Sequence, residues 1–124
     1  MQLEVVAADR LVWSGEAQMV LTRTTDGEIG ILPHHTPVLS VLVSGTVTVT
    51  GDGGDKWAAA VDGGFLSVAA NRVSILAEHA ELADDIDVEQ AKRDLEEAGS
   101  DEDDPAAQHA RAWAQARIDT AGRG

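Results

Sequence analysis

The first 77 residues contain short stretches in which apolar and polar side chains alternate, separated by glycine-rich segments. In the clearest stretch, residues 46–50, threonine and valine alternate and both valines fall on one face of an extended strand. The segment 51–54, Gly-Asp-Gly-Gly, tolerates positive φ and predicts a hairpin. The same pattern predicts strands at residues 3–7, 17–24, 28–32, 46–50, 57–61, 65–69 and 72–76. Short strands without a helical crossover indicate a β sandwich or barrel.

The pattern changes to helical spacing after Ala77. Asp87 stands three residues before Gln90, an arrangement in which the two side chains cap the N-terminus of a helix. Gly99 follows the last apolar position, where a left-handed C-terminal cap is expected. The apolar positions in between are Val88, Ala91, Leu95 and Ala98. These features predict a short amphipathic helix.

A second helix is predicted after a solvated acidic loop at residues 99–104. Asp104 is its expected N-cap and Pro105 its first residue, and the helix ends before Gly122. Its apolar stripe comprises Ala106, Ala110, Trp113, Ala114 and Ile118. Both stripes are rich in alanine, so the hairpin of two helices should pack against the β domain or against a partner.

These patterns divide the chain into a β domain at residues 1–83 and a helical hairpin at residues 84–124. Trp113 lies on the second helix of the hairpin, and a large apolar ring is unusual on an exposed surface. It is therefore either packed against the β domain or an anchor for a partner, because tryptophan is frequent among interface anchors.

The chain of 124 residues carries 22 acidic and 9 basic side chains, which gives a formal net charge of −13. Most of this charge lies in residues 78–104, so the β domain itself is only mildly acidic. Nucleic acids and anionic lipids require clustered Lys and Arg, and aromatic residues that could stack on bases make up only 3% of the chain. The composition argues against nucleic acid as a partner. The absence of cysteine removes disulfides and thiol chemistry.

Residues 1–6 lack the basic region and apolar run of a signal peptide, so a cytoplasmic start is expected. No apolar stretch approaches the ~20 residues that span a bilayer. Any membrane association is therefore expected to occur through a partner, without direct insertion.

The segment from Pro33 to Pro37 contains the adjacent histidines His34 and His35. Neighbouring loop histidines cannot easily face one ion, so this segment indicates a stiff docking loop rather than a metal site. The acidic residues 78–87 lack the central glycine of an EF-hand and are expected to form a solvated connector. The sequence contains neither a nucleophile elbow nor a Walker-type loop. The residues alone indicate a non-catalytic β domain with a helical hairpin, without catalytic or metal-ligating residues.

Residues 27–39, Gly-Glu-Ile-Gly-Ile-Leu-Pro-His-His-Thr-Pro-Val-Leu, resemble the signature of the epsilon subunits of rotary F-type ATP synthases. In that family the pattern reads Gly-Glu-(Ile/Leu)-Gly-Ile-x-Pro-Gly-His-x-Pro-(Leu/Val)-Leu. Residues 12–15 resemble the family's aromatic-Ser-Gly turn, residues 62–68 its Gly-Gly-Phe-Leu-x-Val strand start, and residues 73–77 its closing strand. The resemblance extends in order from residue 3 to residue 98.

The resemblance implies a flattened antiparallel β sandwich of about ten strands followed by two C-terminal helices. It also implies a non-catalytic subunit of the central rotor stalk at the cytoplasmic face of the bacterial plasma membrane. Such a subunit binds the gamma subunit and the ring of c subunits, and it couples proton-driven rotation to ATP synthesis. Its C-terminal helices can reach the catalytic head, made of alpha and beta subunits, and inhibit ATP hydrolysis. The alternative is a free-standing β-sandwich module that binds a small anion or a sugar.

The family's contacts with the c ring and gamma correspond to the signature segment. Glu28 and His35 match family positions there, and Pro33, His34 and Pro37 complete the candidate contact set. The two prolines should hold the loop in one shape for docking. His34 replaces the family's usual glycine.

Some bacterial relatives bind ATP between the β domain and the helices through the motif Ile-Asp-x-x-Arg-Ala. Residues 86–91 match this motif except at Gln90, which replaces the arginine, and Glu81 matches a further acidic position. Glu81 and Asp87 are therefore the candidate nucleotide contacts. The missing arginine, together with Glu97 near another expected arginine, argues against ATP as a regulatory ligand, because carboxylates repel phosphate. We expect no cofactor.

Overall fold

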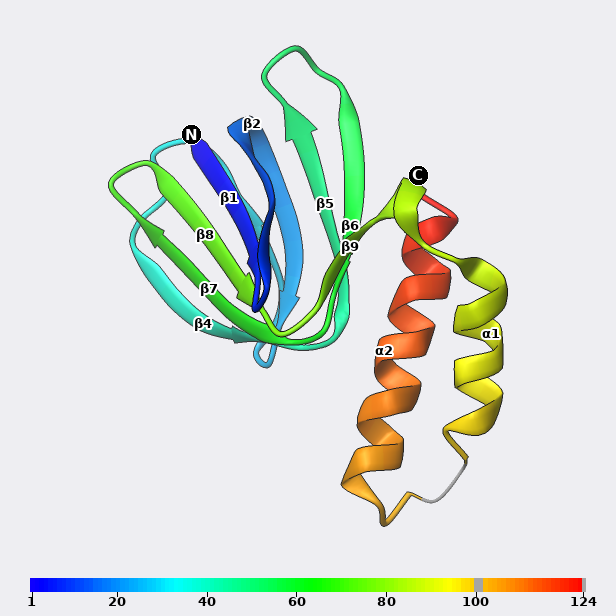
Figure 1. Ribbon diagram of the computed structural model, residues 1–124. Helices are drawn as coiled ribbons and strands as arrows, with labels where there is room; N and C mark the ends of the chain where they lie inside the picture. The colour runs from blue at the N-terminus through cyan, green and yellow to red at the C-terminus, as the bar shows by residue number, and fades with distance from the viewer. Residues whose placement is uncertain (100–101, 124) are drawn as a thin grey trace.

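The computed structural model describes residues 1–99 and 102–123. In this part of the chain, nine strands are followed by a 3-10 turn and two α-helices (Figure 1). The strands are β1 (Gln2–Ala7), β2 (Arg10–Thr24), β3 (Gly27–Ile31), β4 (Val38–Leu42), β5 (Gly45–Gly51), β6 (Lys56–Val61), β7 (Gly64–Ala69), β8 (Arg72–Ala77) and β9 (Ala80–Leu82). The remaining elements are the 3-10 turn η1 (Ala83–Asp85) and the helices α1 (Val88–Glu97) and α2 (Pro105–Ala121).

The strands form two layers that share the long strand β2. The first half of β2 pairs with β1, and the pairing continues through β8 and β7 to β4. We call this layer the first sheet. The second half of β2 pairs with β3 and β5, and the pairing continues from β5 through β6 to β9. We call this layer the second sheet. A register irregularity between Ala17 and Met19 marks where β2 passes from one layer to the other.

The core lies between the two sheets and takes every second side chain of most strands. β6 is an exception, because its last four residues are all buried. In β1, Leu3 and Val5 are fully buried, whereas Glu4 between them is exposed. In β5, Val47 and Val49 are fully buried, as the alternation of threonine and valine predicts. Burying one face of each sheet against the other is the main source of stability for such a sandwich.

The sandwich followed by two helices is confirmed, and each predicted strand is present. β4, the short β9 and the first half of β2 are additional to the predicted strands, and the described part contains nine strands rather than about ten. β1 and β8 pair in parallel, so the sandwich is not antiparallel throughout. β4 lacks the alternating pattern because its outward residues Leu39 and Val41 are apolar.

The helices begin at the predicted residues, but the predicted capping box is only half formed, because the Gln90 side chain bonds Asp94 and Arg93 instead of the backbone of Asp87. The side chain of Asp87 accepts a hydrogen bond from the N–H of Gln90 at 3.0 Å, and Asp104 accepts one from the N–H of Ala106 at 3.0 Å. Gly99 adopts a φ of 77°, the left-handed conformation expected after α1. Ser100 and Asp101 of the predicted acidic loop lie outside the described residues. Neither described helix is long and apolar enough to cross a membrane.

The buried face of α2 differs from its predicted apolar stripe. Ala106 and Ala110 are exposed. The first turns of α2 extend past the sheets (Figure 1). Of the predicted stripe, Ala114 is buried, while Trp113 and Ile118 are half-buried. The other buried residues of α2 are Ala116, Arg117 and Thr120. Two of these are polar, so the face of α2 that meets the β domain is less apolar than the stripe implies.

Candidate functional site

The loop between β3 and β4 is fixed to the neighbouring turn between β7 and β8. The N–H of His34 donates to Asn71 Oδ1 at 2.9 Å, and the N–H of His35 donates to the carbonyl of Leu32 at 3.1 Å. His34 has a φ of 64°, a left-handed conformation that glycine adopts more readily than histidine. His34 thus occupies the backbone conformation that the family's usual glycine tolerates, and its hydrogen bond to Asn71 stabilises it there. The side chain of His34 is exposed.

The two prolines flank this loop, and both are exposed. Among the described residues, no group of three His, Cys, Asp or Glu side chains is arranged to hold a metal ion. The loop therefore presents a fixed polar surface at the end of the sandwich where β7 turns into β8.

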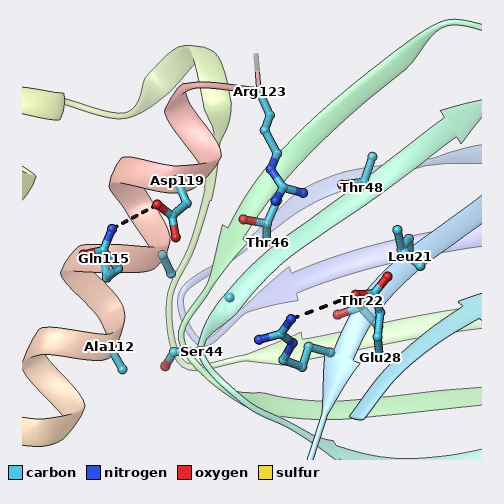
Figure 2. A pocket seen from close by; sticks show the side chains of 13 residues that line it. Leu21, Thr22, Glu28, Ser44, Thr46, Thr48, Ala112, Gln115, Asp119 and Arg123 are labelled. Atoms are coloured by element: carbon cyan, nitrogen blue, oxygen red, sulfur yellow. Dashed lines mark hydrogen bonds and ion pairs between the residues drawn. The ribbon is translucent and has the colours of Figure 1, made fainter.

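Glu28 lies away from this loop, at the other end of β3. It is exposed, and its carboxylate lies 3.9 Å from the guanidinium of Arg23 on β2. Both residues line a cleft of about 350 Å³ between the second sheet and α2 (Figure 2). The structure therefore separates Glu28 from the other four candidate contacts, although all five are close in sequence.

An apolar row crosses the outer face of the first sheet. Its residues lie opposite one another on five neighbouring strands, in the order Val41, Phe65, Leu76, Val6 and Leu11. Phe65 is 54% exposed and Leu76 is 49% exposed, so the row faces outward. Contiguous exposed apolar side chains on a soluble domain mark an interaction surface. Sequence reasoning missed this row because only the strand register brings its members together.

The apolar row borders a hollow of about 490 Å³ at the ends of β1, β7 and β8. Val6, Phe65 and Leu76 line this hollow together with Gly64. The next positions along the same face are polar on β7 and β8, where Ser67 lies opposite Ser74. α2 packs instead against β5, β6 and η1, so the described helices leave the row uncovered.

The candidate nucleotide contacts are engaged within the protein. Glu81 Oε1 lies 2.9 Å from Arg117 Nε, and Arg117 Nη1 donates to Asp94 Oδ2 at 3.1 Å. Asp87 is used as the N-cap of α1. Arg117 thus joins β9, α1 and α2, and its positive charge is already compensated by two carboxylates. No local pattern in the sequence marks this arginine, because both of its partners lie on other elements.

Trp113 packs at the junction between α2 and the β domain. Its ring stacks on the ring of His79 with 6.0 Å between centroids, and the Arg117 guanidinium lies 5.8 Å from its centroid. The ring is half-buried. Of the two roles predicted for Trp113, the structure places it against the β domain.

Position 64, the second of the two glycines in residues 62–68, requires glycine for steric reasons. It has a φ of 114°, and a Cβ atom on it would lie 1.9 Å from the carbonyl oxygen of Leu76 and 2.9 Å from Ala77 Cα. Only glycine fits where β7 begins so close to the backbone of β8. The motif therefore sets the position of Phe65 in the apolar row.

The sandwich, its uncovered apolar row and its docked hairpin define a class of β-sandwich subunit that binds partner proteins. A family model described as ATP synthase, Delta/Epsilon chain, beta-sandwich domain, matches residues 1–83. This chain belongs to the ATP synthase delta/epsilon chain family. Its members are subunits of the ATP synthase complex other than the catalytic one.

Individual relatives agree with this assignment. The chain is 54% identical to the ATP synthase epsilon chain of Streptomyces avermitilis over 103 residues, which is 83% of each chain. It is 47% identical to that of Mycolicibacterium vanbaalenii over 124 residues, covering 99% of this chain and 96% of the relative. None of these relatives supports a free-standing module for a small anion or a sugar.

Solved structures share the fold. A chain of the Euglena gracilis mitochondrial ATP synthase, in an assembly described as OSCP/F1/c-ring, matches with a TM-score of 0.72 and 27% identity. The match covers 97% of this chain and 76% of that one. A chain of the Tetrahymena thermophila mitochondrial ATP synthase, described as central stalk/c-ring, matches with a TM-score of 0.64 over 99% and 94% of the two chains. At 16% identity, this second match concerns the fold alone.

Proposed function

We propose that this protein is a central-stalk subunit of F-type ATP synthase that connects gamma to the c ring. The observation that carries the proposal is the uncovered apolar row on the first sheet of a chain from this family. Permanent interfaces are more apolar than transient ones, so the row suits gamma, which stays bound during rotation. The protein then couples proton-driven rotation of the ring to ATP synthesis without taking part in the chemistry.

The polar loop of Pro33, His34, His35 and Pro37 suits the c ring. Its backbone is tied to Asn71, so the loop keeps its shape when the ring turns against it. Glu28 lies on the α2 side of the sandwich and suits a second, separate contact with gamma. In this arrangement the protein is peripheral, held at the cytoplasmic face of the bacterial plasma membrane by its partners.

The row is tested by Phe65→Asp in the full chain, with binding to purified gamma measured by calorimetry. Placing a charge in the centre of an apolar interface is expected to weaken binding about thirtyfold. Ser67→Asp on the same strand is the matched control, because Ser67 is exposed on the same face but outside the row. Equal affinities of the two variants for gamma would contradict the proposal. Circular dichroism verifies that both variants keep their strands.

We propose further that the hairpin restrains ATP hydrolysis when it leaves the β domain and reaches the alpha and beta subunits. Two of the four buried residues of α2, Arg117 and Thr120, are polar, and a partly polar contact between domains permits relative movement. A chain that ends at Gly99 lacks α2 and is expected to raise the rate of ATP hydrolysis by the assembled enzyme about twofold or more. The check is a steady-state hydrolysis assay, and an unchanged rate would count against an inhibitory hairpin.

ATP itself is not expected to be a ligand of the docked chain. Glu81 is paired with Arg117, whose charge is shared with Asp94. A triphosphate there would meet carboxylates without a free cation. Isothermal titration with Mg-ATP should therefore give no dissociation constant below about 1 mM, a free energy of about −4 kcal/mol. Micromolar binding that is lost in Glu81→Gln would overturn this expectation.

A further inference from the structure

Two carboxylates flank the apolar row, one on each side. Glu4 stands two residues before Val6 on β1, so both side chains lie on the outer face of the first sheet. Glu78 stands two residues after Leu76, just beyond the end of β8, and it lines the hollow beside Val6 and Phe65. β1 and β8 run in parallel, with Val6 opposite Leu76. Glu4 and Glu78 therefore lie on opposite sides of the middle of the row, about 13 Å apart at the rise of an extended strand.

Both carboxylates are available to a partner. Their side chains are exposed to solvent. Within the described residues, neither carboxylate takes part in a hydrogen bond or an ion pair. The backbone at position 78 is held in place, because its carbonyl accepts a hydrogen bond from the N–H of Ala8 at 3.4 Å. Glu78 thus stands at the edge of the hollow with its charge uncompensated.

Other charged groups beside the row are paired within the chain. Asp9, in the turn between β1 and β2, lies 3.5 Å from the guanidinium of Arg10. Asp62 lines the hollow, but its side chain is only 4% exposed. Its two oxygens lie 2.9 Å from Nδ1 of His79, between β8 and β9, and 2.6 Å from Nε2 of His109 on α2. These groups already have partners, unlike Glu4 and Glu78.

Beyond Glu4, the outer face of the first sheet carries two charges of opposite sign. Arg72 on β8 and Glu16 on β2 both lie opposite Gln2 on β1, two residues further from the row than Glu4. Their charges offset each other at this longer distance. β4 and β7 contain no charged residue. Glu4 and Glu78 are therefore the unpaired charges nearest to the middle of the row.

An apolar row does not by itself fix the position of a partner, because apolar contacts are not directional. The row crosses five strands, which corresponds to a length of about 19 Å at the usual strand spacing. Charges at the rim of an interface set the orientation of the partner and accelerate its association. Two like charges on opposite sides of the row select a partner with opposite charges on both sides of an apolar strip.

We propose that the part of gamma that covers the apolar row carries Lys or Arg side chains on both sides of an apolar strip, and that they pair with Glu4 and Glu78. This inference rests on the proposed binding of gamma and adds the chemistry of the gamma surface. The apolar strip excludes water from the centre of the contact, and the two ion pairs at its rim hold gamma in one orientation. A gamma surface displaced along the strands would lose at least one of the two pairs.

The test measures the affinity of the full chain for purified gamma by calorimetry at two salt concentrations. Glu4→Gln and Glu78→Gln, combined in one chain, remove both charges and keep the size of the side chains. At about 50 mM salt this double variant is expected to bind gamma about fivefold more weakly than the parent chain. At about 1 M salt, where charges are screened within about 3 Å, the two affinities should agree within about twofold.

A matched control removes two carboxylates elsewhere. Asp52→Asn, in the turn between β5 and β6, and Asp84→Asn, in η1, change the net charge by the same amount. Both residues are exposed and lie outside the row and its hollow. This control should bind gamma as tightly as the parent chain at both salt concentrations. An equal loss of affinity in the control would reflect net charge alone and would overturn the proposal.

The remaining outcomes separate this inference from the proposed function. If the parent chain does not bind gamma, or if Phe65→Asp binds it as tightly as the parent, the row is not a gamma surface and both proposals fail. If Phe65→Asp weakens binding but the double variant of Glu4 and Glu78 matches the parent at about 50 mM salt, only the basic flanks are overturned. Tighter binding by the double variant would indicate acidic flanks on gamma and would also overturn them. Circular dichroism checks that the strands of each variant are intact.

Discussion

Gly64→Ala is expected to destabilise the β domain by about 4 kcal/mol, the sum of backbone strain and of a forced separation of β7 from β8. The added methyl group would overlap the carbonyl oxygen of Leu76, an atom of the backbone that cannot rotate away. A loss of this size is a large fraction of the stability of a small domain. Urea unfolding followed by circular dichroism measures it.

Gly27→Ala separates the two causes. Gly27 has a φ of 117°, nearly that of Gly64, but a Cβ there would meet no atom within 4 Å. This control carries the backbone strain alone and should lose about 1–2 kcal/mol. Equal losses of unfolding free energy in Gly64→Ala and Gly27→Ala would mean that the close approach between β7 and β8 does not restrict position 64 to glycine.

Arg117→Met is expected to loosen the hairpin while leaving the sandwich folded. The guanidinium side chain is 11% exposed, and its removal leaves Glu81 and Asp94 without their cation. Breaking such a pair from one side should weaken docking by about 2 kcal/mol, a value reduced for the partial exposure of the two carboxylates. Backbone amides of α2 should then exchange with deuterium about thirtyfold faster.

Arg93→Met is the matched control for this variant. Arg93 is exposed on α1, and its guanidinium donates to Gln90 Oε1 of the same helix. Its loss removes one positive charge without touching the β domain, so exchange in α2 should change by less than about twofold. Faster deuterium exchange in β1 and β5 of Arg117→Met would show that the substitution also loosens the sandwich, and it would contradict this prediction.

The sequence is informative wherever burial follows a local period. The alternation in β5 and the caps at Asp87 and Asp104 depend on residues within four positions of one another, so these elements are predictable. β4 cannot be predicted in this way, because its residues Leu39 and Val41 are apolar although they point outward, away from the core.

The site depends on contacts between distant residues. The loop at His34 is held by Asn71, 37 residues away, and the buried Arg117 finds Glu81 and Asp94 on two other elements. The apolar row arises from the register of five strands, and Asp62 meets His109 only after α2 docks. Local sequence patterns do not predict such contacts. The resemblance of residues 27–39 therefore indicates the family, but the positions of these surfaces follow only from the structure.

The single 15-residue strand β2 runs through both sheets. Near its start, Leu11 ends the apolar row, and near its end, Arg23 lines the cleft beside α2. A mechanical load applied at the row therefore reaches the helix side along covalent bonds of one chain segment, without passing through side-chain packing between the layers. The sandwich can then move as one rigid body, because a single continuous backbone joins the apolar row to the cleft beside α2.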